Sequence, residues 1–391
     1  MNFYNEVKSL VKVNIRDYGM YIALFFIMLT FSIMTDGLFM SSRNISNLLD
    51  ATGYIAVLAV GMTLVIVIRH IDLSVGFAAG FLGAITAILL TKAGVPFYIT
   101  IPIILVLGIV VGLFNGVLVA RFGIPSFVAS LAGMLIFRGA LLQVTEKTGT
   151  IIIDDDHFNA IGNGFIPSII EVNGLHLLSL ILGLLCIGLY IYSEFSNRAS
   201  KLKYQFEVVS NKVFTLKLVF VSAIIAYITW ILAGYNGFSW TVVIMLVVVA
   251  AYHFLTSNTV LGRHIYAVGS NPEAAHLSGI SVKKITYIVF GSMGMLSALS
   301  GILFTARLQS ATTTAGTLFE LDAIAAAYVG GVSAAGGVGK VTGAVIGAIV
   351  MASLTSGMNL MGVGISYQYM IRGAILALAV IFDVMTRKKR G

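Results

Sequence analysis

Charged residues are scarce in this chain of 391 residues. Asp, Glu, Lys and Arg together make up 10% of it, whereas hydrophobic residues make up 58%. A soluble domain carries about 25% charged residues, because its surface has to be solvated. The scarcity of charge therefore excludes an ordinary soluble protein and predicts a membrane protein that crosses the bilayer many times.

Cysteine and long basic runs are also missing. The single cysteine, Cys186, lies in an apolar run, so no disulfide can form within one chain. The net charge is +8, but no Lys/Arg run of the kind that binds nucleic acid is present, and we expect no nucleic-acid partner. Glycine is abundant instead, with 41 residues, as is common in membrane helices.

Signatures of catalysis are absent from the sequence. It contains no HExxH pair of histidines and no Gly-x-Ser-x-Gly elbow. Gly339 and Lys340 stand where a phosphate-binding loop would also need a glycine in place of Ala334 and a hydroxyl residue in place of Val341. We therefore expect no enzymatic activity and no cofactor bound by this chain.

The apolar runs predict an all-α, polytopic membrane helix bundle that forms a single domain over 1–391. A spanning helix needs about 20 residues, so the chain has about 10–12 transmembrane segments. Two of them, 76–91 and 321–334, are short and predict broken or half-spanning helices. The apolar segments lie at roughly 18–35, 51–68, 76–91, 97–119, 125–142, 175–193, 216–233, 239–257, 285–305, 321–334, 341–358 and 366–384.

The distribution of Lys and Arg predicts the orientation. Lys8, Lys12 and Arg16 precede the first apolar segment, and no small-residue cleavage site follows them, which favours an uncleaved first span. Cytoplasmic loops of membrane proteins are enriched in Lys and Arg. The N- and C-termini are therefore expected in the cytoplasm. The main connections are then an outer loop at 143–174, an inner loop at 194–215 and a cytoplasmic loop at 258–284.

A short helix with both ends marked lies inside the last of these loops. Asn271 is a preferred N-cap residue, and Pro272 stands at the first helical position, where its missing N–H costs nothing. Glu273 adds negative charge at the positive end of the helix dipole, and Gly279 stands where a left-handed residue ends a helix. The pattern predicts a helix of about two turns, too short to be stable alone in water.

We infer that a second protein holds this helix. Ala274 and Ala275 are small, so a partner backbone can approach them closely. The surrounding stretch Gly262–Lys284 is a polar island between two long apolar runs.

Ionisable residues interrupt two apolar runs between Arg69 and Gly76. Such a cluster at membrane depth indicates a functional site. If the interruption is instead a cytoplasmic turn, Asp72 caps the next helix or pairs with Arg69, and both interpretations stay open. In the outer loop, Asp154, Asp155 and Asp156 favour a solvated acidic loop over a cation site.

Two further patterns favour structural roles. Glycines recur at every fourth position in Gly108–Gly116 and in Gly339–Gly347, and Gly76 begins another such row, which predicts helices packed backbone to backbone. Thr317 and Glu320 fit a capping box that opens the 321–334 helix.

Several motifs resemble those of one family. Glu273–Gly279 resembles the EAA-x-x-x-G loop of ABC importer permeases, which docks into a groove on the ATPase subunit. Ile71–Gly76 reads IDLSVG, Glu320–Ala326 reads ELDAIAA, and Ala335–Gly339 resembles an AGG-x-G turn. All three are similar to motifs of the monosaccharide permeases of the ribose, xylose and galactose group. The resemblance covers almost the whole chain in order.

The insertion at 175–233 and the stretch SGISV at 278–282 resemble the longer xylose and multiple-monosaccharide permeases. One departure is that Arg69 and His70 precede IDLSVG, where the family usually has a small or acidic residue.

The resemblance implies the permease subunit of a monosaccharide importer in the cell (inner) membrane. It implies a homodimer on an ABC ATPase subunit with duplicated nucleotide-binding domains, which uses ATP and Mg, and an extracytoplasmic sugar-binding protein. A proton-coupled secondary sugar transporter is the alternative. The residues expected to couple to the ATPase are Asn271, Pro272, Glu273, Ala274, Ala275 and Gly279, and the candidates for the pathway or gate are Asp72, Ser74, Asn115 and Asp322.

Overall fold

The computed structural model describes residues 15–146, 149–168, 171–172, 175–206 and 208–388. In this part of the chain the elements are helices α2 (Ile15–Met34), η1 (Leu38–Met40), α3 (Ser42–Val67), α4 (Val75–Thr91), α5 (Phe97–Ala120), α6 (Ser126–Thr145), α7 (Asp156–Asn163), α8 (Leu177–Lys203), α9 (Asn211–Ala233), α10 (Trp240–Asn258), α11 (Val260–Ser270), α12 (Pro272–Leu277), α13 (Val282–Leu308), α14 (Phe319–Val329), α15 (Val341–Leu360) and α16 (Ile365–Lys388), with strands β1 (Ile151–Ile152), β2 (Glu171–Val172), β3 (Leu175–His176) and β4 (Ser310–Ala311). The strands form only two small antiparallel ladders, β1 with β4 and β2 with β3.

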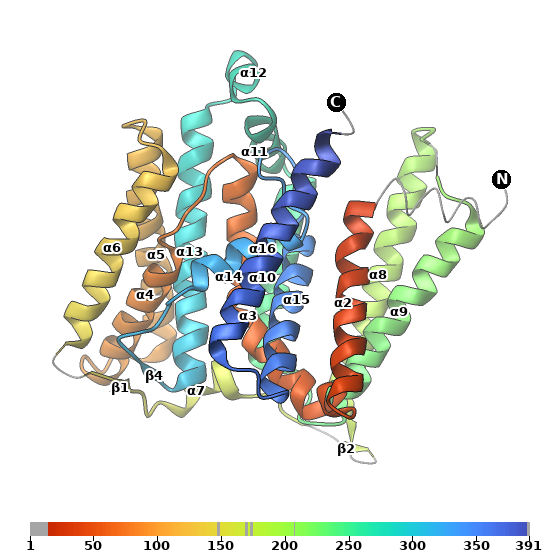
Figure 1. Ribbon diagram of the computed structural model, residues 1–391, viewed down its shortest axis with the longest axis horizontal. Coiled ribbons are helices and arrows are strands. Elements are labelled where there is room, and N and C mark those ends of the chain that lie inside the picture. Colours follow the sequence, from red (N-terminus) through yellow and green to blue (C-terminus); the bar gives the residue numbers. More distant parts are fainter. Residues whose placement is uncertain (1–14, 147–148, 169–170, 173–174, 207, 389–391) are drawn as a thin grey trace.

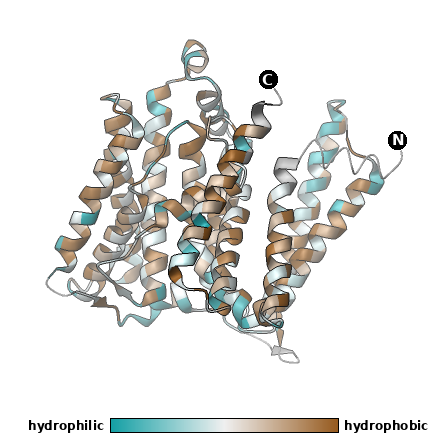
Figure 2. Cartoon of the chain, in the orientation of Figure 1, coloured by the Kyte–Doolittle hydropathy of each residue, from teal (hydrophilic) through white to brown (hydrophobic). Residues whose placement is uncertain are grey.

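Long apolar helices dominate the described residues. Nine of them are long and apolar enough to cross a membrane: α3, α5, α6, α8, α9, α10, α13, α15 and α16. Figure 2 shows hydrophobic residues along the helices and hydrophilic ones mainly toward the two ends of the bundle. Each apolar segment of the sequence overlaps a helix, although the segment predicted at 321–334 is helical only to Val329. The prediction of an all-α, polytopic membrane bundle is confirmed.

The two short segments form the helices α4 and α14, and whether either crosses the membrane fully stays a prediction. Helix α14 has 11 residues, which span about 16 Å, about half of a hydrocarbon core. Helix α4 has 17 residues and follows the irregular stretch 68–74. The N-terminal ends of α4 and α14 lie against each other, because a Cβ atom at Gly76 would lie 2.5 Å from the carbonyl oxygen of Gly316, just before α14.

The two ends of the bundle carry different elements (Figure 1). The start of α2, the end of α16, the α8–α9 connection, α11 and α12 share one end, while β1, β4 and α7 lie at the other. This grouping matches the predicted sides of the loops at 143–174, 194–215 and 258–284. The terminal residues themselves, with Lys8, Lys12, Lys389 and Arg390, lie outside the described residues.

The inner loop predicted at 194–215 is mostly helical, which corrects its boundaries. Helix α8 continues to Lys203 and α9 begins at Asn211, so the connection spans only 204–210. The two helices are tied together near this end: the Lys217 ammonium lies 2.8 Å from Glu194, and Arg198 donates to the carbonyl of Val209. Polar composition alone did not reveal this helical hairpin, because solvated helix ends and loops use the same residues.

The glycine row on α5 lies directly against α13. A Cβ atom at Gly108 would lie 2.6 Å from the carbonyl oxygen of Gly294, and one at Gly112 would overlap the carbonyl oxygen of Phe290. Bare backbones therefore touch, as the spacing predicted.

A second glycine contact joins α15 to α14. Cβ atoms at Gly343 and Gly347 would overlap carbonyl oxygens of Gly330 and Ala326. Gly339 is not part of this face, because α15 begins only at Val341.

The capping box predicted at Thr317 and Glu320 is wrong. Helix α14 starts after Leu318, which has a left-handed backbone (φ 65°) and makes no side-chain cap. The Thr317 hydroxyl donates to the carbonyl of Thr314 instead. The tight turn at 314–318 turns the hydroxyl away from the helix N-terminus.

Candidate functional site

The short helix predicted at 271–279 is α12, and both of its ends are as expected. The Asn271 side chain accepts hydrogen bonds from the backbone N–H groups of Glu273 (3.0 Å) and Ala274 (3.1 Å). Pro272 stands at the first helical position. Gly279 has φ 83° and follows the helix. These local contacts hold the helix in a fixed shape at one end of the bundle, where it projects from α11 and α13 (Figure 1).

The exposed face of α12 differs from the expected one. Ala275 is 4% exposed and belongs to the protein's own hydrophobic core, so it is not available to a partner. Ala274 is exposed, and Leu277 is 87% exposed. Leu277 was not among the residues predicted to contact a partner, because only the packing of α12 on the bundle decides which of its residues are exposed.

Three of the four candidate pathway residues meet in one buried cluster. The Asp72 carboxylate accepts hydrogen bonds from the Ser74 hydroxyl (2.6 Å) and the Ser74 backbone N–H (2.9 Å). The Asn115 amide of α5 donates to the Ser74 hydroxyl at 2.7 Å. All three side chains are buried, and none of them lines the cavity described below. The cluster fixes the irregular stretch 68–74 against α5. The predicted Arg69–Asp72 alternative is wrong, because Arg69 bonds elsewhere.

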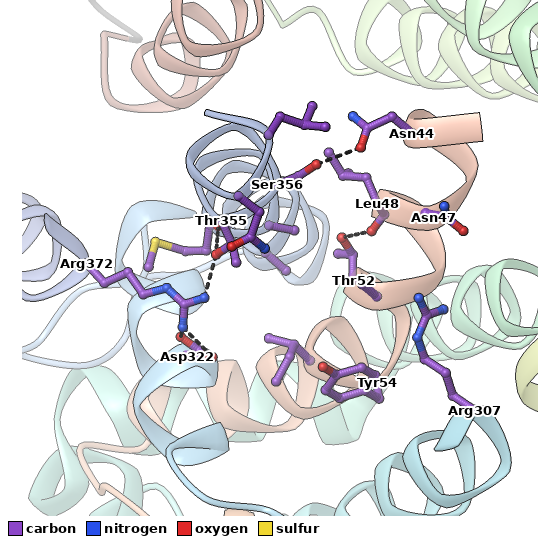
Figure 3. A pocket seen from close by; sticks show the side chains of 17 residues that line it. Asn44, Asn47, Leu48, Thr52, Tyr54, Arg307, Asp322, Thr355, Ser356 and Arg372 are labelled. Carbon is purple, nitrogen blue, oxygen red and sulfur yellow. Dashed lines mark hydrogen bonds and ion pairs between the residues drawn. The ribbon is translucent and has the colours of Figure 1, made fainter. Parts of the chain in front are cut away.

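The fourth candidate, Asp322, lines a cavity of about 390 Å³ between α3, the end of α13, α14, α15 and α16 (Figure 3). Arg372 of α16 donates to the Asp322 carboxylate at 3.2 Å and to the Thr355 hydroxyl at 2.5 Å. The polar residues that line the cavity are Asn44, Asn47, Thr52, Tyr54, Arg307, Asp322, Thr355, Ser356, Asn359 and Arg372.

The cavity is polar but balanced in charge. Arg372 pairs with Asp322, and the Arg307 guanidinium lies 4.0 Å from the carboxylate of Asp50. Figure 3 shows Arg307 and Tyr54 side by side at the wall of the cavity. The Tyr54 ring also packs on Phe319 with centroids 5.1 Å apart. The wall thus offers hydrogen-bonding groups and an aromatic ring without a strong net charge, which suits a neutral ligand that is rich in hydroxyl groups.

The sequence pointed to Asp322 but not to the rest of this cavity. Asn44, Tyr54, Arg307 and Arg372 are brought together from helices far apart in the chain. An arginine inside an apolar segment, as at Arg372, was the one signal that could have suggested a buried functional group.

One residue of the acidic run at 154–156 caps a helix, and Asp154 and Asp156 are exposed. Asp155 caps α7 by accepting a hydrogen bond from the Phe158 N–H at 3.0 Å. No group of three or more His, Cys, Asp or Glu side chains suited to a metal ion occurs within the described ranges. The interpretation as a solvated acidic loop stays a prediction.

Nine long apolar helices among the described residues, a polar cavity between helices and a short helix projecting from one end are the architecture expected of a membrane permease. The chain belongs to the family described as the permease component of branched-chain amino acid transport systems, which matches residues 44–380.

Curated relatives are similar over nearly the whole chain. The chain is 41% identical to a xylose transport system permease protein of Haemophilus influenzae over 382 residues, which cover 97% of this chain and 99% of the relative. It is 38% identical to the xylose permease protein of Escherichia coli K12, over 99% and 95% of the two chains. It is 33% identical to a ribose import permease protein of Haemophilus influenzae, over 88% and 86%. No solved structure matches the chain. The resemblance stated from the motifs is confirmed, and the comparisons give no support to a secondary transporter.

Proposed function

We propose that this chain is the transmembrane permease subunit of an ATP-binding-cassette sugar importer and that its substrate is a xylose-like monosaccharide. The observation that carries this proposal is the similarity to xylose permeases over 97% of the chain and 99% of the relative. The ribose import permease among the relatives supports the same substrate class. The balanced charge of the cavity favours a neutral sugar over an ionic solute.

The same proposal assigns the energy source to a partner. The permease is non-catalytic and binds no cofactor, and a separate ABC ATPase subunit with duplicated nucleotide-binding domains uses ATP and Mg. The exposed Leu277 and Ala274 of α12 supply a rigid docking surface for that subunit. An extracytoplasmic sugar-binding protein delivers the monosaccharide, and two permease chains form a homodimer in the lipid bilayer of the cell inner membrane.

Uptake by the reconstituted transporter tests this function. In proteoliposomes that contain the permease, its ATPase and its sugar-binding protein, xylose uptake should require ATP. It should continue when the proton gradient is collapsed while ATP is maintained, because the described cavity offers no chain of titratable groups across the membrane. Uptake that stops with the gradient while ATP stays high would instead establish a proton-coupled transporter.

Labelling of single cysteines tests the orientation. In a Cys186→Ser background, Asp154→Cys should react with an impermeant thiol reagent in whole cells whose outer barrier has been opened. Tyr204→Cys should react only after the cytoplasmic membrane is permeabilised. Both positions are exposed. Asp154 lies between β1 and α7, and Tyr204 follows α8, whose C-terminal end lies at the opposite end of the bundle from β1 and α7 (Figure 1). The opposite labelling pattern would reverse the proposed sides.

The cavity at Asp322 is proposed as the outer part of the sugar path. It lies toward the end of the bundle that carries β1, β4 and α7 (Figure 1), and α3 and α16 enter it from that end while α13 and α15 finish there. Its volume of about 390 Å³ is within the range of small-molecule sites, about 300–1,000 Å³. Asn47 and Tyr54 line this cavity, and an amide and a phenol hydroxyl are groups that bind sugar hydroxyls.

Loss of these groups should weaken sugar binding without breaking the complex. Asn47→Leu and Tyr54→Phe should each raise the KM for xylose about three- to tenfold, since a hydrogen bond contributes about 0.5–1.5 kcal/mol. Binding of the ATPase should be unchanged. Gln143→Leu, an exposed polar position on α6 outside the cavity, is the matched control. Unchanged KM values in both cavity variants would show that the sugar passes elsewhere.

A further inference from the structure

Arg69 ends helix α3 in a conformation that normally requires glycine. The N–H of Arg69 bonds to the carbonyl of Ile66 (2.9 Å) and that of His70 to Val65 (3.0 Å). This pair of bonds is a Schellman motif, in which the first residue beyond the cap is left-handed and is usually glycine. Arg69 occupies that position with φ 66°. An arginine there carries a steric cost that a glycine would avoid, so its side chain needs a compensating role.

The side chain of Arg69 reaches the end of α11, two hundred positions away in the sequence. Its Nε donates to the carbonyl of Gly269 at 2.7 Å, and its Nη2 donates to the carbonyl of Ser270. These are the last residues of α11, where carbonyl groups lack helical partners and the helix dipole is negative. The next residue, Asn271, is the N-cap of α12.

A third segment packs against the C-terminal ends of α3 and α11. The N–H of Gly337 donates to the carbonyl of Val67 at 2.8 Å. A Cβ atom at Gly336 would overlap the Arg69 side chain, and one at Gly269 would lie 2.8 Å from the backbone nitrogen of Gly337. This segment, 333–339, connects α14 to α15. One small junction therefore holds the start of the α12 docking helix, the stretch that leads into α4 and the stretch that follows α14.

We propose that Arg69 is a positioning residue that couples α12 mechanically to the two short helices α4 and α14. A displacement of α12 by the ATPase passes through Asn271 and Ser270 to the Arg69 guanidinium. From there it reaches 68–74, which the Asp72 cluster fixes to α5, and 333–339, which continues into α14 with its cavity residue Asp322. The non-helical stretches 68–74 and 333–339 are loop segments of the kind that serve as hinges between moving elements. The proposal rests on the ATPase-driven function proposed above.

A distance measurement tests this link in the permease alone. In a Cys186→Ser background, spin labels at Ser278→Cys and Val338→Cys report the separation of α12 from the 333–339 segment, and both positions are exposed. We expect a narrow distance distribution with Arg69 and a clearly broader one with Arg69→Gly, which keeps the left-handed backbone but removes both hydrogen bonds. Arg69→Lys should lie between the two, because its ammonium can reach one carbonyl. A distribution that Arg69→Gly leaves unchanged would overturn the proposal.

Coupling in the full transporter gives the second readout. Arg69→Gly should retain the bound ATPase and its basal ATP hydrolysis, while sugar imported per ATP falls at least tenfold. Arg263→Ala, an exposed arginine on α11, is the matched control and should import normally. If Arg69→Gly imports as much sugar per ATP as the wild type, Arg69 only ends helix α3 and has no role in coupling. If the unmodified transporter imports no sugar, the proposed function fails, while the distance measurement still decides the mechanical link.

If Arg69→Gly does not accumulate as folded protein, the distance distribution and the import per ATP are measured on Arg69→Lys instead. A narrow distribution and full import in Arg69→Lys would then contradict the need for two hydrogen bonds from one planar guanidinium.

Discussion

Replacement of Leu277 by aspartate should abolish binding of the ATPase and leave the permease folded. Leu277 is 87% exposed at the end of α12, so its substitution disturbs no internal packing. Full burial of a leucine in a partner groove contributes about 1.5–3 kcal/mol, and a buried unpaired carboxylate adds a desolvation cost of several kcal/mol. At about 1.4 kcal/mol per factor of ten, the Kd for the ATPase should rise at least about a hundredfold.

Co-purification with the ATPase and sugar-stimulated ATP hydrolysis in nanodiscs measure this effect. Leu202→Asp is the matched control, because Leu202 is also exposed and lies near the end of α8 on the same side of the bundle. Normal ATPase binding by Leu277→Asp would mean that α12 is only a connector between membrane spans. The central assignment of the docking helix would then fail.

Gly279 and Ala275 affect the same helix in different ways. Gly279→Val forces a β-branched residue into φ 83° while meeting no neighbouring atom, so it should reorient α12 and reduce coupling without unfolding the bundle. Ala275→Trp is a test of stability instead, because Ala275 is buried in the core. The expectation that both alanines face a partner is therefore corrected for Ala275 and stays a prediction for Ala274.

Gly112→Leu should prevent the permease from accumulating in the membrane. Helix α5 touches α13 through bare backbone at this position, and a Cβ atom alone would already overlap the carbonyl oxygen of Phe290. Overpacking in a core usually costs about 1–3 kcal/mol, and the cost here should reach or exceed the upper value because backbone rather than a flexible side chain stands in the way. Such a loss is a large share of the free energy of unfolding of an ordinary protein, which is about 5–15 kcal/mol.

Membrane-fraction abundance and thermal unfolding in detergent measure this prediction. Gly139→Leu is the matched control, because Gly139 lies on α6 and a Cβ atom added there would meet no other atom within 4 Å. A Gly112→Leu permease that assembles normally but transports a different sugar would show that the α5 face lines the path rather than packing against α13.

Local sequence determined the class of the protein and the shape of helix α12. Scarce charge and long apolar runs are enough to specify a polytopic bundle, because the bilayer imposes the same demand on every segment. The contacts that cap α12 join Asn271 to residues two and three positions away, so a short stretch contains all the information. The glycine spacing on α5 predicted backbone contact, because a four-residue interval places the glycines on one helix face.

Only the tertiary structure decided which surfaces these elements present. Whether Ala275 or Leu277 faces outward depends on how α12 rests on the bundle, which no local pattern records. The Thr317 capping box failed because the turn at 314–318 takes the hydroxyl away from the helix. Arg69 meets Ser270, and Arg372 meets Asp322, across long separations in sequence. Such pairs arise from helix packing. They could not be predicted from the sequence, because caps and periodic patterns relate residues only a few positions apart.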